Sequence, residues 1–286
     1  MSADRPPLLM LPGLLCDRVA WAATAALLPQ FDCRVPSWGT LDTIGAMAQH
    51  VLATVAEPRF AVAGHSMGGR VALEVARRAP HRVTHLALLD TGYQALPEGE
   101  AADKERAGRA ALLARARAEG MRAMGQVWAT GMVHPDQIAT PLFESILDMI
   151  ERSSPEQFAA QIHALLGRPD ATAVLGELRC PTLVLCGRQD TWSPLARHEI
   201  MAGLIPGAVL RVVEHSAHMS PMERPQAVAD AMREWLARPA PNAGATQGWA
   251  HDARRSADRL RHRSAHARRR ARETGVLRPG DALRRL

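Results

Sequence analysis

The sequence predicts an α/β fold with a mostly parallel sheet, helices on both faces of the sheet and an all-helical insertion. Short apolar runs alternate with helical patterns along much of the 286 residues, which is typical of a parallel sheet covered by helices. The alternation stops from about Ala95 to Asp170, where the helical stretches are rich in Ala, Met, Arg and Leu. We therefore expect a core at residues 1–94 and 171–238 and a helical cap at residues 95–170.

Four strands and three helices are expected before the cap. Residues 8–11 are a short apolar run that Pro12 and Gly13 stop, which is typical of a buried strand before a turn. Residues 43–54 place apolar side chains at helical spacing. The other elements expected here are a helix at 21–28, strands at 33–36, 60–64 and 85–90, and a helix from Ser66 to about Ala79.

Strands and helices alternate again after the cap. The expected elements are a strand at 182–186, a helix from about Pro194, a strand at 209–213 and a helix at 225–236. Residues 239–244 have the Pro, Gly and Asn content of a linker, so the folded core is expected to end at residue 238.

The net charge of +6 is concentrated at one end of the chain. Residues 239–286 contain twelve Arg and four acidic residues, a net charge of +8, which leaves −2 for the rest. This Arg-rich tail lacks a sustained apolar face, so we expect it to be disordered. Binding to nucleic acid or another anionic partner through the tail is a non-enzymatic alternative that we do not favour, because only Trp249 could stack on a base.

Composition excludes several classes of protein. The longest apolar runs are far shorter than the roughly 18 residues that a membrane span needs, and the N-terminus lacks the pattern of a signal peptide. Cys180 and Cys186 would lie roughly 20 Å apart along one strand, too far for a disulfide. No glycine-rich phosphate loop or metal-type cluster occurs, so no cofactor or metal is expected. A cytoplasmic protein fits these observations best.

The motif Gly64-His65-Ser66-Met67-Gly68 carries the strongest chemical signal. An apolar strand precedes it and a helical pattern follows, as a nucleophile elbow requires. A serine on such a tight turn has a strained backbone, and Gly at positions 64 and 68 removes side chains that would clash. We therefore expect Ser66 to be a nucleophile rather than part of a plain glycine-rich turn.

A serine nucleophile needs a base and an acid that orients the base. Asp190 follows the strand expected at 182–186, and His218 follows the strand at 209–213. His215 is a second candidate for the base, and Asp90 also ends a strand and is a second candidate for the acid. We favour His218 and Asp190.

Together these motifs resemble those of the α/β-hydrolase fold family, in its serine hydrolase or esterase branch with a helical cap. The resemblance rests on the elbow, on Gly-x-x-Asp at 187–190 and on His-x-x-x-x-Glu-x-Pro at 218–225, and it covers roughly residues 8–238. Two positions depart from the family pattern. Pro12 replaces the common His before Gly13, and Ala217 replaces the usual Gly before the histidine; neither removes a reacting group.

The resemblance implies an oxyanion hole made of two backbone N–H groups. One belongs to Met67, after the nucleophile, and the other to the loop after the first strand. Leu14 is the favoured second donor, and Leu15 is its nearest competitor. Elsewhere near the site, Glu223 is expected to hold the histidine loop through hydrogen bonds.

The cap is expected to select the substrate. Trp128, Met132 and Phe143 are candidates for an apolar substrate pocket, although at helical spacing a role in the core of the cap is favoured. Six cations lie between Lys104 and Arg122. Such a face could hold an acidic partner such as an acyl carrier protein, but a solvated helix face is favoured.

We expect an enzyme that cleaves a carboxylic ester with a small or medium acyl group through an acyl-enzyme on Ser66. The substrate is expected to be a small molecule. A serine at this position excludes the branches of the fold that use an aspartate nucleophile. Activity as a thioesterase, enol-lactonase, carbon–carbon bond hydrolase, perhydrolase or acyltransferase stays open.

Overall fold

A computed structural model describes residues 5–241 of the chain. Its centre is one six-stranded sheet with the strand order β2-β1-β3-β4-β5-β6, in which every neighbouring pair is parallel. The strands are β1 (Pro7–Leu11), β2 (Asp32–Arg34), β3 (Phe60–His65), β4 (Val83–Leu89), β5 (Thr182–Gly187) and β6 (Val209–Val213). The predicted α/β fold is therefore confirmed.

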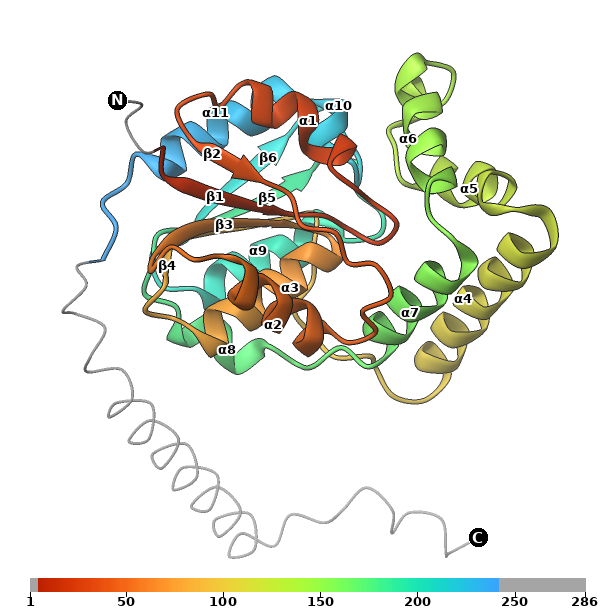
Figure 1. The fold of residues 1–286 in the computed structure, drawn as a ribbon, viewed down its shortest axis with the longest axis horizontal. Coiled ribbons are helices and arrows are strands. Elements are labelled where there is room, and N and C mark those ends of the chain that lie inside the picture. Colours follow the sequence, from red (N-terminus) through yellow and green to blue (C-terminus); the bar gives the residue numbers. More distant parts are fainter. Residues whose placement is uncertain (1–4, 242–286) are drawn as a thin grey trace, which may run out of the picture. The chain divides into compact units, whose positions relative to one another are not determined.

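Helices cover both faces of this sheet (Figure 1). On one face lie α1 (Val19–Ala26), α10 (Ser220–Glu223) and α11 (Pro225–Leu236), which contact one another. On the other face lie α2 (Ile44–Thr54), α3 (Met67–Arg78), α8 (Thr172–Glu177) and α9 (Leu195–Leu204). Because both faces are covered, β3 and β5 are buried along their whole length, which explains their continuous apolar sequences.

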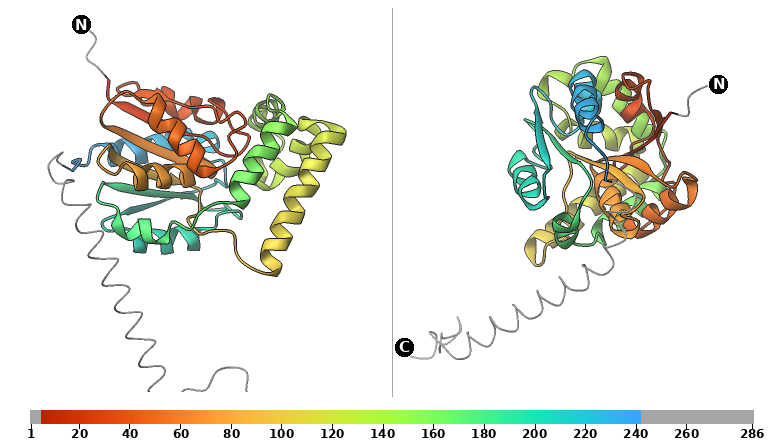
Figure 2. Two further views of the ribbon diagram at one scale, coloured as in Figure 1. Left: turned by 60° about the horizontal axis from the view of Figure 1, so that its bottom comes forward. Right: turned by 90° about the vertical axis from the view of Figure 1, so that its left-hand side faces the viewer.

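Four further helices lie between β4 and β5 in the sequence. They are α4 (Glu100–Glu119), α5 (Met121–Trp128), α6 (Pro141–Glu151) and α7 (Pro155–Leu166), with short 3₁₀ turns at Ala129–Gly131 and Pro135–Gln137. Figures 1 and 2 show α4–α7 gathered beyond the carboxyl ends of the strands. Local sequence sets their ends: Gly120 separates α4 from α5 at a φ of 92°, and Ser154 caps α7 in a capping box with Gln157.

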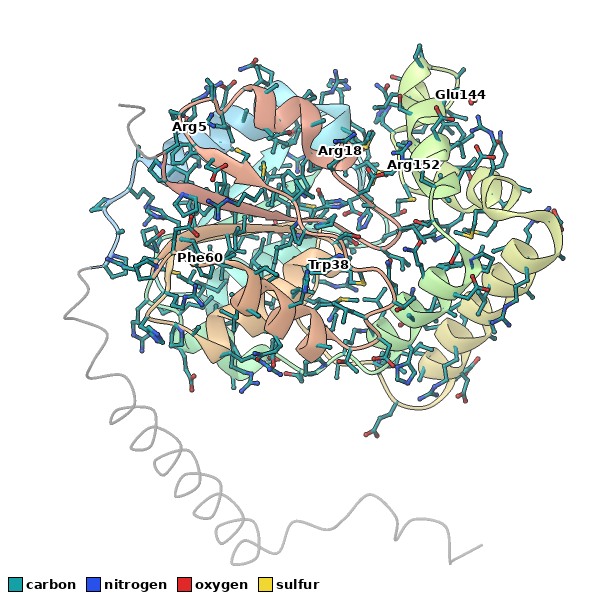
Figure 3. All side chains as sticks on the ribbon, viewed as in Figure 1. Arg5, Arg18, Trp38, Phe60, Glu144 and Arg152 are labelled. Carbon is teal, nitrogen blue, oxygen red and sulfur yellow. The ribbon has the colours of Figure 1, made fainter. Side chains whose placement is uncertain are left out.

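Two polar contacts join these helices to the loop after β1. Asp17 pairs with Arg152 at 2.8 Å, near the labelled Arg152 in Figure 3, and its other oxygen accepts the N–H of Val19 at 2.7 Å. The N–H of Leu15 donates to Gln161 Oε1 at 2.8 Å. Sheet and insertion belong to one compact unit over the described residues. We propose residues 95–170 as the cap, as the sequence predicts.

The described chain ends in contact with the sheet region. His85 Nε2 lies 2.8 Å from the carbonyl oxygen of Arg238, and Arg59 donates to the carbonyl oxygen of Pro241 at 2.5 Å. Only the first residues of the predicted Arg-rich tail are described, and residues 242–286 lie outside the described chain. Within the described residues, no helix is long and apolar enough to cross a membrane.

Truncation after Pro241 is expected to leave thermal stability nearly unchanged. All strands of the sheet precede this point, and the truncated chain keeps the carbonyl groups of Arg238 and Pro241 that accept hydrogen bonds. A scanning calorimetry comparison should give melting temperatures within about 2 °C of each other, which corresponds to less than about 1 kcal/mol. A fall of 8 °C or more would show that residues 242–286 stabilise the fold.

Candidate active site

The candidate site lies where the strand order of the sheet reverses. β1 pairs with β2 on one side and with β3 on the other, and the helices that follow β1 and β3 cover opposite faces of the sheet. A crevice therefore opens beyond the carboxyl ends of these two strands, the usual position for ligands in open α/β sheets. Gly13 follows β1 and Ser66 follows β3, so both sit at this crevice.

Ser66 lies on a sharp turn between β3 and α3. Its backbone has a φ of 53° and a ψ of −118°, a strained conformation for a residue with a side chain. The turn brings backbone segments so close that a Cβ on Gly64 would lie 2.2 Å from the Gly68 oxygen, and a Cβ on Gly68 would lie 2.1 Å from the Leu11 oxygen. Only glycine fits at both positions, as the sequence predicts for a nucleophile elbow.

His218 is placed with one ring nitrogen toward Ser66. Its Nε2 lies 2.8 Å from Ser66 Oγ, and its Nδ1 lies 2.8 Å from Asp190 Oδ2. Because the Asp190 carboxylate accepts the Nδ1 proton, Nε2 is free to accept the hydroxyl proton of Ser66. Burial lowers the pKa of His218, but the charge and hydrogen bond of Asp190 outweigh burial and raise the pKa above its ordinary value.

Asp190 is held as a charged group. Its Oδ1 accepts the backbone N–H groups of Trp192 and Ser193, both at 2.8 Å. Burial raises the pKa of Asp190, but His218 and these two N–H groups outweigh burial and lower the pKa below its ordinary value. The carboxylate is therefore ionised and fixed in orientation toward His218.

The histidine loop is held by Glu223. Its Oε1 accepts the N–H groups of Ala217 at 2.9 Å and Met219 at 3.1 Å, on either side of His218. Its Oε2 accepts the N–H of His134 from the helical insertion at 2.7 Å. These bonds are the arrangement that the sequence predicts for Glu223. The other histidine candidate, His215, is exposed on the preceding turn.

Asp90 makes a different set of contacts from Asp190. It is fully buried, accepts the Gly187 N–H at 2.8 Å and shares a short hydrogen bond with the Ser220 hydroxyl. Burial and the nearby Asp190 charge raise the pKa of Asp90 well above its ordinary value, since two close carboxyl groups do not ionise together. Within the described chain Asp90 makes no hydrogen bond to His218, so the structure pairs Asp190, and not Asp90, with the histidine.

The two predicted oxyanion donors, Leu14 and Met67, line the same cavity as Ser66. Met67 is the first residue of α3, so its N–H has no partner inside the helix. Leu14 lies in the turn from Gly13 to Cys16, and among residues 5–241 no acceptor lies within hydrogen-bonding distance of its N–H. The competing donor, Leu15, is already bonded to Gln161. The geometry favours Leu14 over Leu15 as the second oxyanion donor.

One buried group of three possible metal ligands occurs in the described part of the chain: Asp90, Cys186 and Asp190. Its oxygens already accept hydrogen bonds from Gly187, Ser220, His218 and two backbone N–H groups. Burial also raises the pKa of the Cys186 thiol, which opposes the thiolate that a metal prefers. These residues do not fit a metal ion.

A cavity of about 960 Å³ opens beside Ser66 and His218. Trp128 and Met132, two of the three predicted pocket residues, line it. Phe143, the third candidate, does not line this cavity: it is 2% exposed and packs in the hydrophobic core, which is the role that its helical spacing favours.

Sequence reasoning missed Trp192 in the cavity wall. The Trp192 ring lies 5.1 Å from the ring of His218 and 5.4 Å from the ring of Trp128, measured between centroids. The available sequence signal was its position two residues after Asp190, which places Trp192 in the loop beside the site. In the structure its N–H donates to the Asp190 carboxylate.

Comparison with known proteins identifies the family. Residues 8–231, more than half of the chain, match the sequence pattern described as the alpha/beta hydrolase family. The chain belongs to the alpha/beta hydrolase family. The structure of a thermophilic esterase from Thermogutta terrifontis is similar to this hydrolase, with a TM-score of 0.70 and 31% identity over 81% of this chain and 89% of that one.

The match to this chain covers nearly the whole length of two curated relatives. A pimeloyl-[acyl-carrier protein] methyl ester esterase from Aromatoleum aromaticum is 28% identical over 78% of this chain and 95% of the relative. A 2-succinyl-6-hydroxy-2,4-cyclohexadiene-1-carboxylate synthase from Serratia proteamaculans is 26% identical over 83% and 96%. Because the chain belongs to the alpha/beta hydrolase family and is similar to a methyl ester esterase and a thermophilic esterase, it is a hydrolase enzyme.

Proposed function

We propose that this hydrolase cleaves a carboxylic ester of a small or medium acyl group through Ser66, His218 and Asp190. The observation that carries the proposal is the continuous hydrogen-bond chain from Ser66 Oγ through both His218 nitrogens to Asp190, with two bonds of 2.8 Å. A hydroxyl on a strained elbow, a neutral base and a fixed carboxylate are the components of covalent serine catalysis.

The reaction proceeds in two halves. Ser66 Oγ bonds to the carbonyl carbon while its proton passes to His218 Nε2, and the N–H groups of Leu14 and Met67 stabilise the oxyanion by a few kcal/mol each. The carbon–oxygen bond to the alcohol breaks as His218 returns the proton to the leaving oxygen. Water then attacks the acyl-enzyme, again with His218 as base, and releases the acid.

The names of relatives support ester cleavage and keep other reactions in view. Besides the methyl ester esterase, a 3-oxoadipate enol-lactonase 2 from Acinetobacter baylyi is 28% identical over 69% of this chain. One relative is named a synthase. We propose esterase activity first, and thioesterase, lactonase, carbon–carbon hydrolase, perhydrolase and acyltransferase activities are the alternatives that substrate tests must separate.

We propose a free small-molecule ester rather than an ester carried on a protein. Of the six cations from Lys104 to Arg122, four pair with carboxylates of this chain, on Asp103, Glu105, Glu119 and the acidic residues of α6. Such pairing leaves less charge for an acidic acyl carrier protein. The predicted role of the Arg-rich tail in binding anionic partners falls on residues outside the described chain.

A panel of acyl esters and thioesters with graded chain length tests the proposed function. We expect turnover of p-nitrophenyl acetate and butyrate, with slower turnover of long acyl chains, and retention of this activity after truncation at Pro241. If thioesters are preferred by more than about 100-fold in kcat/KM, the thioesterase alternative replaces the proposal. If neither class turns over, ester cleavage is wrong.

Activity is expected to fall as the pH is lowered through the pKa of His218. The base must be neutral, and Asp190 raises the His218 pKa above 6.5, so the acidic limb of kcat/KM on a neutral ester should bend above pH 6.5 and drop about tenfold per pH unit below the bend. In the Asp190→Asn variant, residual activity should bend at a lower pH. An unchanged bend would contradict the assignment of Asp190.

A further inference from the structure

The cavity beside Ser66 is lined by more cationic than acidic side chains. Five cationic side chains line it: Arg70, Lys104, Arg109, Arg168 and Arg197. Three acidic side chains also line it: Glu98, Glu105 and Asp170. The local pairing of these groups decides whether any positive charge remains for a substrate.

The Glu105 carboxylate accepts hydrogen bonds from two of the arginines. Arg168 forms a two-pronged pair with it, with both distances 2.8 Å, and Arg109 donates to the same carboxylate at 2.8 Å. Arg168 is 8% exposed at its side chain, and its Nε is buried without a hydrogen-bond partner. This trio carries two positive charges and one negative charge.

Asp170 is engaged by backbone groups. Its two oxygens accept the N–H groups of Thr172 at 2.8 Å and Ala95 at 3.4 Å. Glu98 is exposed at the outer end of the cavity. Arg70 is near enough to Asp170 to help the Thr172 hydrogen bonds lower the pKa of that carboxyl, but within the described residues neither Arg70 nor Arg197 forms an ion pair with an acidic oxygen within 4.0 Å.

Arg70 and Arg197 meet over the backbone of Gly92. A Cβ on Gly92 would lie 2.8 Å from Arg70 Nη2 and 3.5 Å from Arg197 Nη1. Arg70 Nη1 donates to the Gln94 carbonyl at 2.7 Å, and Arg197 Nη1 donates to the Trp192 carbonyl at 3.2 Å. Within the described residues, the Nε and Nη2 groups of both side chains have no hydrogen-bond acceptor.

This arrangement holds unbalanced positive charge. Burial, followed by repulsion from Arg168 and Arg197, lowers the pKa of Arg70 to about 9. Guanidinium groups stay protonated in proteins, so the repulsion is a cost that a bound anion would relieve. Two guanidiniums with free N–H groups match the two oxygens of a carboxylate.

Arg70 also has a fixed place relative to the proposed nucleophile. It lies four residues after Ser66, one turn along α3, so both side chains rise from the same end of one helix. Because Ser66, Arg70 and Arg197 line one cavity, a single molecule bound there can present a carbonyl group to Ser66 and a second group to the two arginines.

We propose that the substrate of this hydrolase is an ester that carries a second, free carboxylate, which Arg70 and Arg197 bind. The inference rests on the proposed ester cleavage and names the class of substrate. Arg109 and Arg168 share the single negative charge of Glu105, which leaves one further positive charge at the same cavity. Half-esters of dicarboxylic acids are the simplest members of this class.

The test compares monoethyl adipate with its neutral, isosteric amide, ethyl adipamate, and extends to half-esters from succinate to suberate. Wild-type enzyme should prefer the best half-ester by at least about 30-fold in kcat/KM. The preference should fall to less than about threefold in Arg70→Gln and Arg197→Gln, while Arg197→Lys keeps part of it. Arg115→Gln is the control, because the Arg115 side chain on α4 is 40% exposed and pairs with Glu119 outside the cavity.

A measurement on unmodified enzyme covers the case in which Arg70→Gln does not fold. Adipate should inhibit hydrolysis of p-nitrophenyl acetate competitively and more weakly as salt increases, whereas neutral adipamide should not inhibit. Equal turnover of half-ester and amide, with normal turnover of p-nitrophenyl acetate, would overturn the carboxylate site and leave the proposed esterase intact. A stronger preference for ethyl 4-phosphonobutanoate would assign the site to phosphoryl groups instead. Loss of all ester turnover would refute the proposed function itself.

Discussion

The Ser66→Ala variant is expected to lose at least about 10⁴-fold in kcat on p-nitrophenyl butyrate. The change removes the oxygen that bonds to the carbonyl carbon, and His218 then has no hydroxyl within 2.8 Å to activate. Removal of one hydroxyl leaves the strained turn and its glycine contacts in place, so circular dichroism and the melting temperature should match the wild type.

Ser145→Ala is the matched control for this experiment. Ser145 is exposed on α6 and donates to the Pro141 carbonyl at 3.1 Å, so its loss removes a hydroxyl without touching the site. Turnover of the control should equal that of the wild type. Survival of Ser66→Ala activity within tenfold, in protein free of contaminating esterase, would defeat the assignment of Ser66.

The two buried carboxyl groups are expected to respond very differently to amide substitution. Asp190→Asn should lower kcat by at least about 100-fold, because the amide no longer stabilises the imidazolium and can hold the wrong tautomer of His218. Asp90→Asn should lower kcat by less than about tenfold. Asp90 makes no hydrogen bond to His218, and an amide can still accept the Gly187 N–H and donate to Ser220 Oγ.

Measured side by side on one activated ester, these variants control for each other, since both change a buried carboxyl group to an amide. Circular dichroism confirms that each is folded. If Asp90→Asn is the inactive variant, the acid follows β4 and the assignment of Asp190 fails. If both variants lose less than tenfold, neither carboxylate is essential for orienting His218.

Most of the fold follows from local sequence. All six strands were expected near their observed positions, because buried parallel strands are short apolar runs ended by Gly, Pro or a polar loop. Residues 33–36 were expected for β2, but its pairing with β1 covers Asp32–Arg34. The residues at which a strand begins and ends depend on where the neighbouring strand pairs with it. The four-residue helix α10 was missed because it is a single turn inside the histidine loop.

The arrangement of the candidate site is predictable where a motif carries it. Ser66, Asp190 and His218 each follow a strand, and parallel strands bring their carboxyl ends to one edge. The cationic cavity was not predictable. Arg70, Arg168 and Arg197 come from α3, the end of α7 and α9, and only the packed structure shows that Glu105 balances Arg168 but not the other two. Phe143 could not be separated from Trp128 and Met132 as a pocket candidate, because helical spacing alone does not show which side of a helix faces a cavity.

Covalent trapping of Ser66 tests the central claim most directly. The full-length protein is treated with a fluorophosphonate, and the adduct is located by peptide mass spectrometry. We predict one phosphonyl group on the peptide that contains Ser66, complete loss of turnover at one equivalent, and labelling slowed by at least about 100-fold in His218→Ala. An adduct on another residue such as Cys16, or undiminished turnover by enzyme whose Ser66 is fully labelled, would contradict the account.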